Sequence, residues 1–169
     1  MFKIKSQKYS NILYEPTEDI WFDINEVGTP FRFDVTEEIT KDEEKMNKVG
    51  FVLDNIDNII SKVFDYLHEQ LQDTQSQYYS IISYFLEFHY NEFKDGRLGE
   101  LLGIKDDKDI SVNDMLKYLK LNRLGSDFDE KFNDQIYILD FMYNTDMTDE
   151  ILVVYLNSQS EVIVVTHES

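Results

Sequence analysis

Residues 151–166 read ILVVYLNSQSEVIVVT, and this stretch decides the fold. It contains two apolar, β-branched runs joined by the polar residues 157–160, a turn of the kind that links two strands of a hairpin. The first run, 151–156, is apolar throughout, which indicates a central strand. The second run, 161–166, predicts the last strand of the chain. A further strand is expected over 136–143, so the C-terminal end predicts a β-meander.

A second pair of strands is expected near the N-terminus. Residues 20–25 and 31–36 both alternate apolar and polar side chains, which is typical of half-buried strands. The Gly-Thr-Pro sequence at 28–30 is a turn signal, so the two runs predict an antiparallel hairpin. Residues 2–5 alternate in the same way and predict a short additional strand.

Between these two regions the apolar residues recur with a helical period. One helix is expected over 44–72, with Thr40 as the first residue of a capping box. A second helix over 76–93 is apolar around much of its circumference, so it is expected to lie between other elements. Two shorter helices are expected over 98–102 and 112–119.

This order of elements, strands then helices then strands, indicates the α+β class. We expect one domain over residues 1–169, in which the N-terminal hairpin and the C-terminal meander form an antiparallel sheet covered on one face by the two main helices. The length of 169 residues is that of one ordinary domain. Hydrophobic residues make up 42% of the chain, which is enough for a core and argues against disorder.

The chain is strongly acidic, with 34 acidic and 16 basic residues and a formal net charge of −18. Direct binding to nucleic acid is not expected, because phosphate contacts require a basic stripe. Binding to an anionic membrane surface is disfavoured for the same reason. A basic protein partner fits the charge. The alternative is that the charge only maintains solubility.

Half of the net charge lies in residues 15–44, where eleven acidic residues face only Arg32 and Lys41. Some of these acids precede an expected helix, where the helix dipole favours them whatever the function. The informative acids are those for which no helix start is expected, and they are the candidate partner-binding residues. These residues are Glu18, Asp19, Asp34, Glu37 and Glu38. Asp34 is expected to point away from the core, because it alternates with Phe33 and Val35.

No catalytic residue, cofactor-binding residue or metal ligand is expected, and the chain is not expected to be an enzyme. It has no cysteine, which excludes disulfides, thiolate zinc sites and cysteine nucleophiles. His68 begins a zinc-protease pattern but lacks the second histidine four residues on. His89 lies on the apolar stripe of its helix and is expected to be a packed core residue. His167 is close to the end of the chain, a poor position for a preorganised base.

The first residues, MFKIKS, lack the apolar centre of a signal peptide. No apolar run approaches the ~18 residues that a membrane span needs. The sequence therefore predicts a cytoplasmic protein.

The C-terminal residues also carry a resemblance to known domains. The sequences TDEILVVYLN at 148–157, EVI at 161–163 and THES at 166–169 resemble the end of a group of small acidic bacterial domains of unknown function. The order of elements is similar too, including a long helix with Asn-Ile-Asp at its centre, here residues 55–57, and a tyrosine-rich second helix. Several related groups are thought to be immunity proteins, which are cytoplasmic and neutralise a cognate toxin. The resemblance implies an immunity-type inhibitor of a basic toxin.

Three hypotheses about function follow from the sequence. The first is a cytoplasmic protein that binds a basic protein partner, as an immunity-type inhibitor does. The second is a small enzyme or ligand-binding domain with a pocket between helices and sheet. The third is a homodimeric structural or interaction protein joined through an aromatic face or an edge strand.

Overall fold

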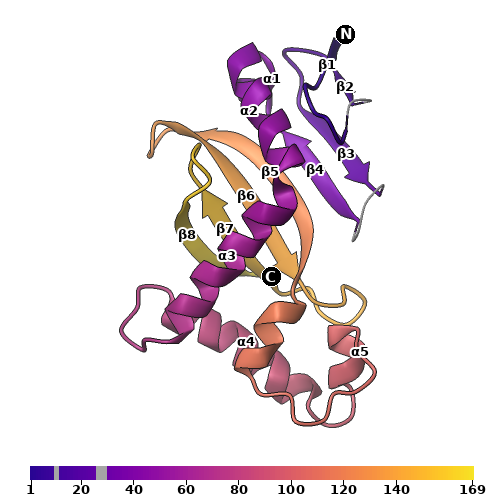
Figure 1. The fold of residues 1–169 in the computed structure, drawn as a ribbon, viewed down its shortest axis with the longest axis vertical. Coiled ribbons are helices and arrows are strands. Elements are labelled where there is room, and N and C mark those ends of the chain that lie inside the picture. Colours follow the sequence, from indigo (N-terminus) through magenta and orange to yellow (C-terminus); the bar gives the residue numbers. More distant parts are fainter. Residues whose placement is uncertain (10–11, 26–29) are drawn as a thin grey trace.

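A computed structural model describes residues 1–9, 12–25 and 30–169. It contains a two-stranded and a six-stranded sheet with helices packed against the larger one (Figure 1). The strands are β1 (Phe2–Lys3), β2 (Leu13–Tyr14), β3 (Ile20–Ile24), β4 (Phe31–Val35), β5 (Lys120–Asp129), β6 (Asp134–Met142), β7 (Ile151–Leu156) and β8 (Val162–Glu168). The helices are α1 (Glu37–Thr40), α2 (Glu43–Asp54), α3 (Ile56–Leu71), α4 (Tyr79–Phe93), α5 (Leu98–Leu102) and the 3-10 helix η1 (Asn113–Tyr118).

The α+β class is confirmed, but the large sheet is mixed rather than antiparallel. Its order is β3-β4-β5-β6-β7-β8. The β3–β4 hairpin and the β5–β8 meander are antiparallel, as expected. The two parts meet through β4 and β5, which run parallel. The reason is the crossover: all the helices lie between these two strands, and a helical crossover returns the chain in the same direction. The Gly-Thr part of the expected β3–β4 turn lies outside the described residues.

The strand β5 was not predicted from the sequence, because apolar and polar side chains do not alternate regularly along it. Leu121 pairs with Phe141, but the next pair is Arg123 with Asp140, so Asn122 is the extra residue of a β-bulge. The bulge separates the buried Leu121 and Leu124 by three positions instead of two, which breaks the period of a strand.

The expected helix over 44–72 is two helices, α2 and α3, which meet at Asn55. Its side-chain amide donates to the carbonyl of Phe51 at 2.8 Å, which offers the backbone an alternative to helical bonding. The expected cap at Thr40 is also wrong, because Thr40 ends α1. The carboxylate of Asp42 caps α2 instead, accepting bonds from the amides of Glu44 and Lys45 at 3.0 and 3.2 Å.

The other three helix predictions were closer to the structure. The expected helix over 76–93 is α4, which begins three residues later. The expected short helices are α5, with the bounds predicted, and η1, which is a 3-10 helix. Ser111 and Asp114 exchange side-chain and backbone bonds at the start of η1, as an N-terminal capping box does.

One face of the large sheet forms the core with the helices. A row of five paired residues crosses the sheet on this face, each at most 1% exposed: Phe33, Leu124, Leu139, Val154 and Val165. The apolar stripe of α3 packs on this side, and the rings of Phe64 and Phe141 lie 5.2 Å apart. Because strand side chains alternate, the neighbouring row points to the opposite, outer face of the sheet. That row contains Arg32, Arg123, Asp140, Val153 and Thr166.

The small β1–β2 sheet docks on α2. A Cβ atom at Gly50 would lie 2.1 Å from the carbonyl oxygen of Lys5, so the segment and the helix approach closely at this glycine. One helical turn later, the carboxylate of Asp54 accepts bonds from the Ser6 hydroxyl and from the amides of Gln7 and Lys8, at 2.6 to 3.0 Å. The N-terminal segment therefore lies close against α2, where one carboxylate accepts hydrogen bonds from three of its residues.

Candidate functional site

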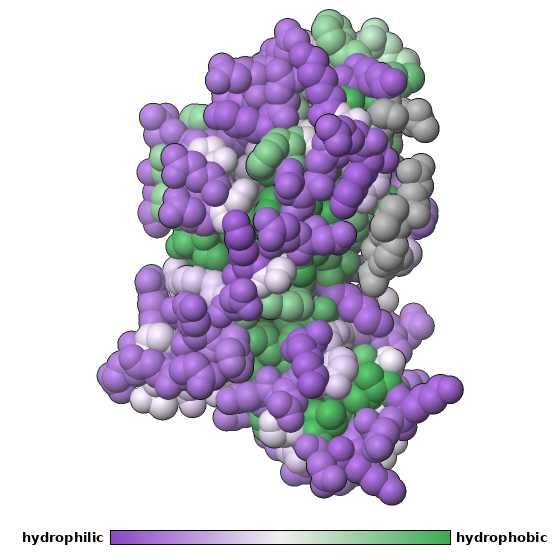
Figure 2. Space-filling view, in the orientation of Figure 1, coloured by the Kyte–Doolittle hydropathy of each residue, from purple (hydrophilic) through white to green (hydrophobic). Residues whose placement is uncertain are grey.

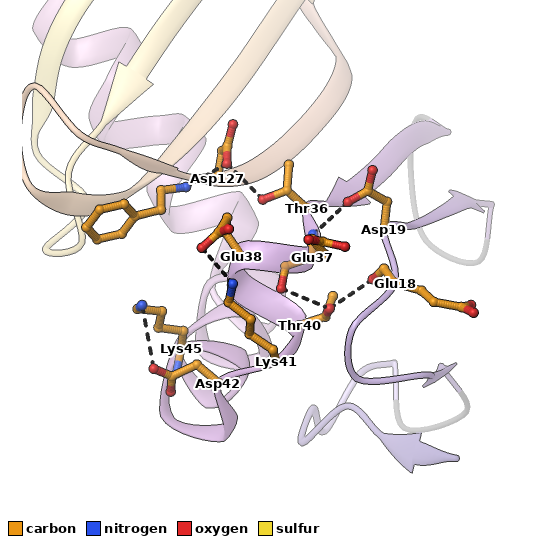
Figure 3. Close-up of polar contacts among 11 residues, drawn as sticks. Glu18, Asp19, Thr36, Glu37, Glu38, Thr40, Lys41, Asp42, Lys45 and Asp127 are labelled. Atoms are coloured by element: carbon orange, nitrogen blue, oxygen red, sulfur yellow. Dashed lines mark hydrogen bonds and ion pairs between the residues drawn. The ribbon is translucent and has the colours of Figure 1, made fainter.

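Four of the five candidate residues gather where the chain enters β3 and where α1 begins (Figure 3). These four, Glu18, Asp19, Glu37 and Glu38, are exposed and are called the acidic end. The carboxylate of Asp19 accepts a bond from the amide of Glu37 at 2.6 Å. The hydroxyl of Thr40 donates to the carbonyl of Glu18 at 2.8 Å. These two bonds fix the segment before β3 against α1.

No helix start was expected at these acids, and this expectation is wrong. Glu37 and Glu38 form the first turn of α1, where acidic side chains favourably meet the helix dipole. The side chain of Thr36, the residue before the helix, makes no capping bond and donates to Asp127 instead. Asp19 therefore caps α1 from outside the helix. Part of the acid at this end has a local structural role.

Most of the charge at the acidic end is not neutralised by a neighbouring cation. Glu38 pairs with Lys41 at 2.9 Å, in an exposed contact of small energetic value. Glu18, Asp19 and Glu37 make no ion pair with any described residue. Hydrophilic side chains cover the α1–α2 end of the molecule in the view of Figure 2. The acidic end is therefore a solvated surface with its charge available.

Asp34, the fifth candidate, lies elsewhere and is neutralised. As expected, it points away from the core, and its carboxylate accepts two bonds from Arg123, at 2.6 Å from Nε and 2.9 Å from Nη2. This pairing raises the pKa of Arg123. A carboxylate held by a bidentate guanidinium offers little free charge to a partner. Asp34 is thus not part of the acidic end.

Arg123 also contacts Asp140, through Nη1 at 3.4 Å. We call Asp34, Arg123 and Asp140 the Arg123 cluster. Asp140 is only 9% exposed, and burial raises the pKa of its carboxyl despite the nearby guanidinium. Arg123 and Asp140 were not predicted from the sequence, because β5 was not predicted and the strand pairing that joins them was therefore not expected. The available signal was Asp140, a single charged residue within the apolar run 136–143.

A cavity of about 400 Å³ opens beside the Arg123 cluster, on the outer face of the sheet. Its polar lining comes from β3, β4, β5 and β6 and the residues next to them. The polar lining residues are Asp23, Asn25, Arg32, Asn122, Arg123 and Asp140. This is a concave site with converging hydrogen-bonding groups, which is the general form of a ligand site.

The three histidines lie in different surroundings. His89 is fully buried, as expected, and lies between the carbonyl of Phe85 at 2.8 Å from Nδ1 and the hydroxyl of Thr148 at 3.1 Å from Nε2. Burial lowers the pKa of His89, because it disfavours the charged ring. His167 contacts the carboxylate of Glu150. His68 is exposed on α3.

Within the described residues, no group of three or more histidine, cysteine, aspartate or glutamate side chains is arranged to hold a metal ion. Among the helices in the same part of the chain, none combines the length and the apolar character needed to cross a membrane.

Comparisons of the chain with protein-family models, with curated proteins and with solved structures found no match.

Proposed function

We propose that this chain is a binding protein for a basic protein partner. The observation that carries the proposal is the set of three exposed carboxylates at the acidic end, Glu18, Asp19 and Glu37, without a cation partner among the described residues. They belong to a chain of net charge −18. A field of this sign steers a basic partner toward the surface and raises its rate of association.

The ion pairs of the surrounding segment reduce this field without removing it. Residues 15–44 carry nine excess negative charges by sequence. Four cationic groups from outside the segment, the amine of Met1 and the side chains of Lys5, Lys45 and Arg123, pair with its carboxylates, so the excess falls to five. A surface with this remaining charge favours a partner that brings cations of its own.

Two basic side chains of the N-terminal segment lie beside helical carboxylates. Lys5 lies beside Glu43 of α2 at 3.4 Å, and Lys8 lies beside Asp57 of α3 at 3.6 Å. Both contacts are exposed, so each contributes little to stability. A basic partner at the neighbouring α1 would make contacts of the same kind.

The resemblance of residues 148–169 to small acidic bacterial domains gives this proposal its specific form. In that form, the chain is a cytoplasmic immunity-type inhibitor, and its partner is a basic toxin. The proposal does not assign a reaction to the chain.

The test is a pair of charge reversals with a matched control, after the partner has been isolated from the native host by pull-down. Glu18→Lys with Glu37→Lys alters the acidic end and leaves the Asp19 cap in place. Glu69→Lys with Glu92→Lys makes the same change of net charge on α3 and α4, at exposed positions without an ion pair to a described residue.

The acidic-end variant should associate with the partner at least roughly threefold more slowly at low salt, and the control should change much less. Stopped-flow association rates at several salt concentrations measure this, and circular dichroism checks that both variants fold. Equal slowing in both variants would show that only net charge matters. Unchanged association in the acidic-end variant would remove α1 from the interface.

A further inference from the structure

The Arg123 cluster owes its geometry to the β-bulge at Asn122. Without the extra residue, regular pairing would place Arg123 opposite Leu139, on the core face of the sheet. The bulge instead pairs Arg123 with Asp140 and turns its side chain to the outer face. Bulges that re-aim a side chain in this way are over-represented next to functional sites.

Gly125 lets the cluster lie flat on the sheet. A Cβ atom at this position would lie 2.8 Å from Nη2 of Arg123 and 3.0 Å from Oδ1 of Asp34. The first contact is shorter than a Cβ atom makes and the second is tight, so any other residue here would force the paired side chains to shift. The bulge and the glycine together hold the guanidinium in one place.

Within the cluster, the guanidinium of Arg123 donates more and shorter hydrogen bonds to one carboxylate than to the other. Asp34 takes two short bonds, from Nε and Nη2. The long bond from Nη1 is the single hydrogen bond to the Asp140 carboxylate from any described residue. A largely buried carboxylate usually has several strong donors, because desolvation of a charge is costly. Asp140 therefore retains accepting capacity, and it lines the cavity.

The charges around the cavity favour a cation over an anion. The charged residues at the cavity are three acids, Asp23, Asp34 and Asp140, and two bases, Arg32 and Arg123. The cavity therefore has one excess negative charge, in a chain of net charge −18. The guanidinium of Arg32 lies over the ring of Trp21, 5.9 Å from its centroid, and this ring is 66% exposed at the edge strand. An anion would meet Arg123, which is already bonded to two carboxylates, and Arg32, whose guanidinium lies over the Trp21 ring. A cation would meet carboxylates that can still accept hydrogen bonds.

We propose that this cavity binds a cationic hydrogen-bond donor, a guanidinium or a primary ammonium group, against Asp140 and Asp23. The site goes beyond the proposed function, because it uses neither the acidic end nor any identified partner. Two sources can supply the same group: a basic side chain of a protein, or a free small cation.

The test is an NMR titration of the isolated protein with small probes: methylguanidine, methylammonium, and a short peptide with a single central arginine. Inorganic phosphate and acetate are the anionic counterparts. Amide signals of Asn122, Arg123 and Asp140 report binding. The cations should produce saturable shifts with a dissociation constant of about 10 mM or lower, and the anions should produce none.

Asp140→Asn should weaken cation binding at least roughly tenfold, which is about 1.4 kcal/mol, while Asp95→Asn, at an exposed position after α4, should leave it unchanged. Asp23→Asn gives a second reading should Asp140→Asn fail to fold. A peptide that binds more tightly than methylguanidine identifies a protein side chain as the source, and equal affinities identify a free cation.

Saturable binding of phosphate or acetate in place of the cations would overturn the proposal. So would an Asp140→Asn protein that binds methylguanidine as the wild type does, or the absence of any saturable shift. The titration contains no protein partner. Its failure would therefore leave the proposed function standing, and loss of the proposed function would leave the titration unaffected.

Discussion

At the scale of single residues, two buried tyrosines differ by one hydrogen bond. The hydroxyl of Tyr143 donates to the carbonyl of Met115 at 2.8 Å. The hydroxyl of Tyr137, in a side chain only 1% exposed, has no hydrogen-bond partner among the described residues. An unsatisfied buried hydroxyl costs about 1–3 kcal/mol, so the two positions should respond oppositely to loss of the oxygen.

Tyr137→Phe should leave the free energy of unfolding unchanged or raise it by about 1 kcal/mol. Tyr143→Phe should lower it by about 1–2 kcal/mol, because the Met115 carbonyl loses its donor in a buried place. Urea unfolding of the two variants beside the wild type measures both effects. A larger loss at Tyr137 than at Tyr143 would mean that a bound water satisfies the Tyr137 hydroxyl.

At the scale of elements, sequence periodicity predicted the parts of the fold that obey it. The strands β7 and β8 and the β3–β4 hairpin appear where alternation and turn residues placed them. The failures are local exceptions to periodicity. The bulge at Asn122 hid β5, and the amide of Asn55 interrupted a continuous helical stripe.

In the candidate site too, some features could be predicted from the sequence and others could not. Exposure of the acidic end could be predicted from composition, but its helix start could not, since α1 is only four residues long and has no apolar stripe. The cap by Asp19 joins two segments far apart in sequence, and no local pattern encodes it. The Arg123 cluster depends on pairing across three strands, which is a tertiary property.

The close contact between α2 and the N-terminal segment predicts the effect of replacing Gly50. Replacing glycine by alanine inside a helix ordinarily stabilises it by roughly 1 kcal/mol. At Gly50 the added Cβ would lie 2.1 Å from the Lys5 carbonyl oxygen, so Gly50→Ala should instead destabilise by ~1–3 kcal/mol.

The loss should be confined to the docked N-terminal segment. Hydrogen exchange at the amides of Gln7 and Lys8, which Asp54 holds, should accelerate, while exchange in β6 and β7 should stay slow. Lys48→Ala, at an exposed position of the same helix, serves as the control. Uniform acceleration throughout the chain would show that the segment is not an independent unit.

At the scale of the whole molecule, the charge acts on folding and on binding in opposite directions. With a net charge of −18, the excess carboxylates repel one another in the folded chain. The surface ion pairs are mostly exposed and weak, so they offset little of this repulsion. Salt screens this repulsion over a Debye length of about 8–10 Å near physiological ionic strength. The same ions screen the attraction between the acidic end and a basic partner.

Raising potassium chloride from low to physiological concentration should therefore stabilise the fold, by on the order of 1 kcal/mol, while it slows association with the partner. The midpoint of urea unfolding measures the first effect, and stopped-flow association the second. Chloride is the suitable anion, because sulfate also strengthens burial of apolar surface and would obscure screening. Glu18→Lys with Glu37→Lys reduces the net negative charge from −18 to −14, because it replaces two of the 34 acids with two bases. This variant should gain less stability from salt than the wild type. A fold that loses stability as chloride rises would show that attractive ion pairs outweigh the net repulsion.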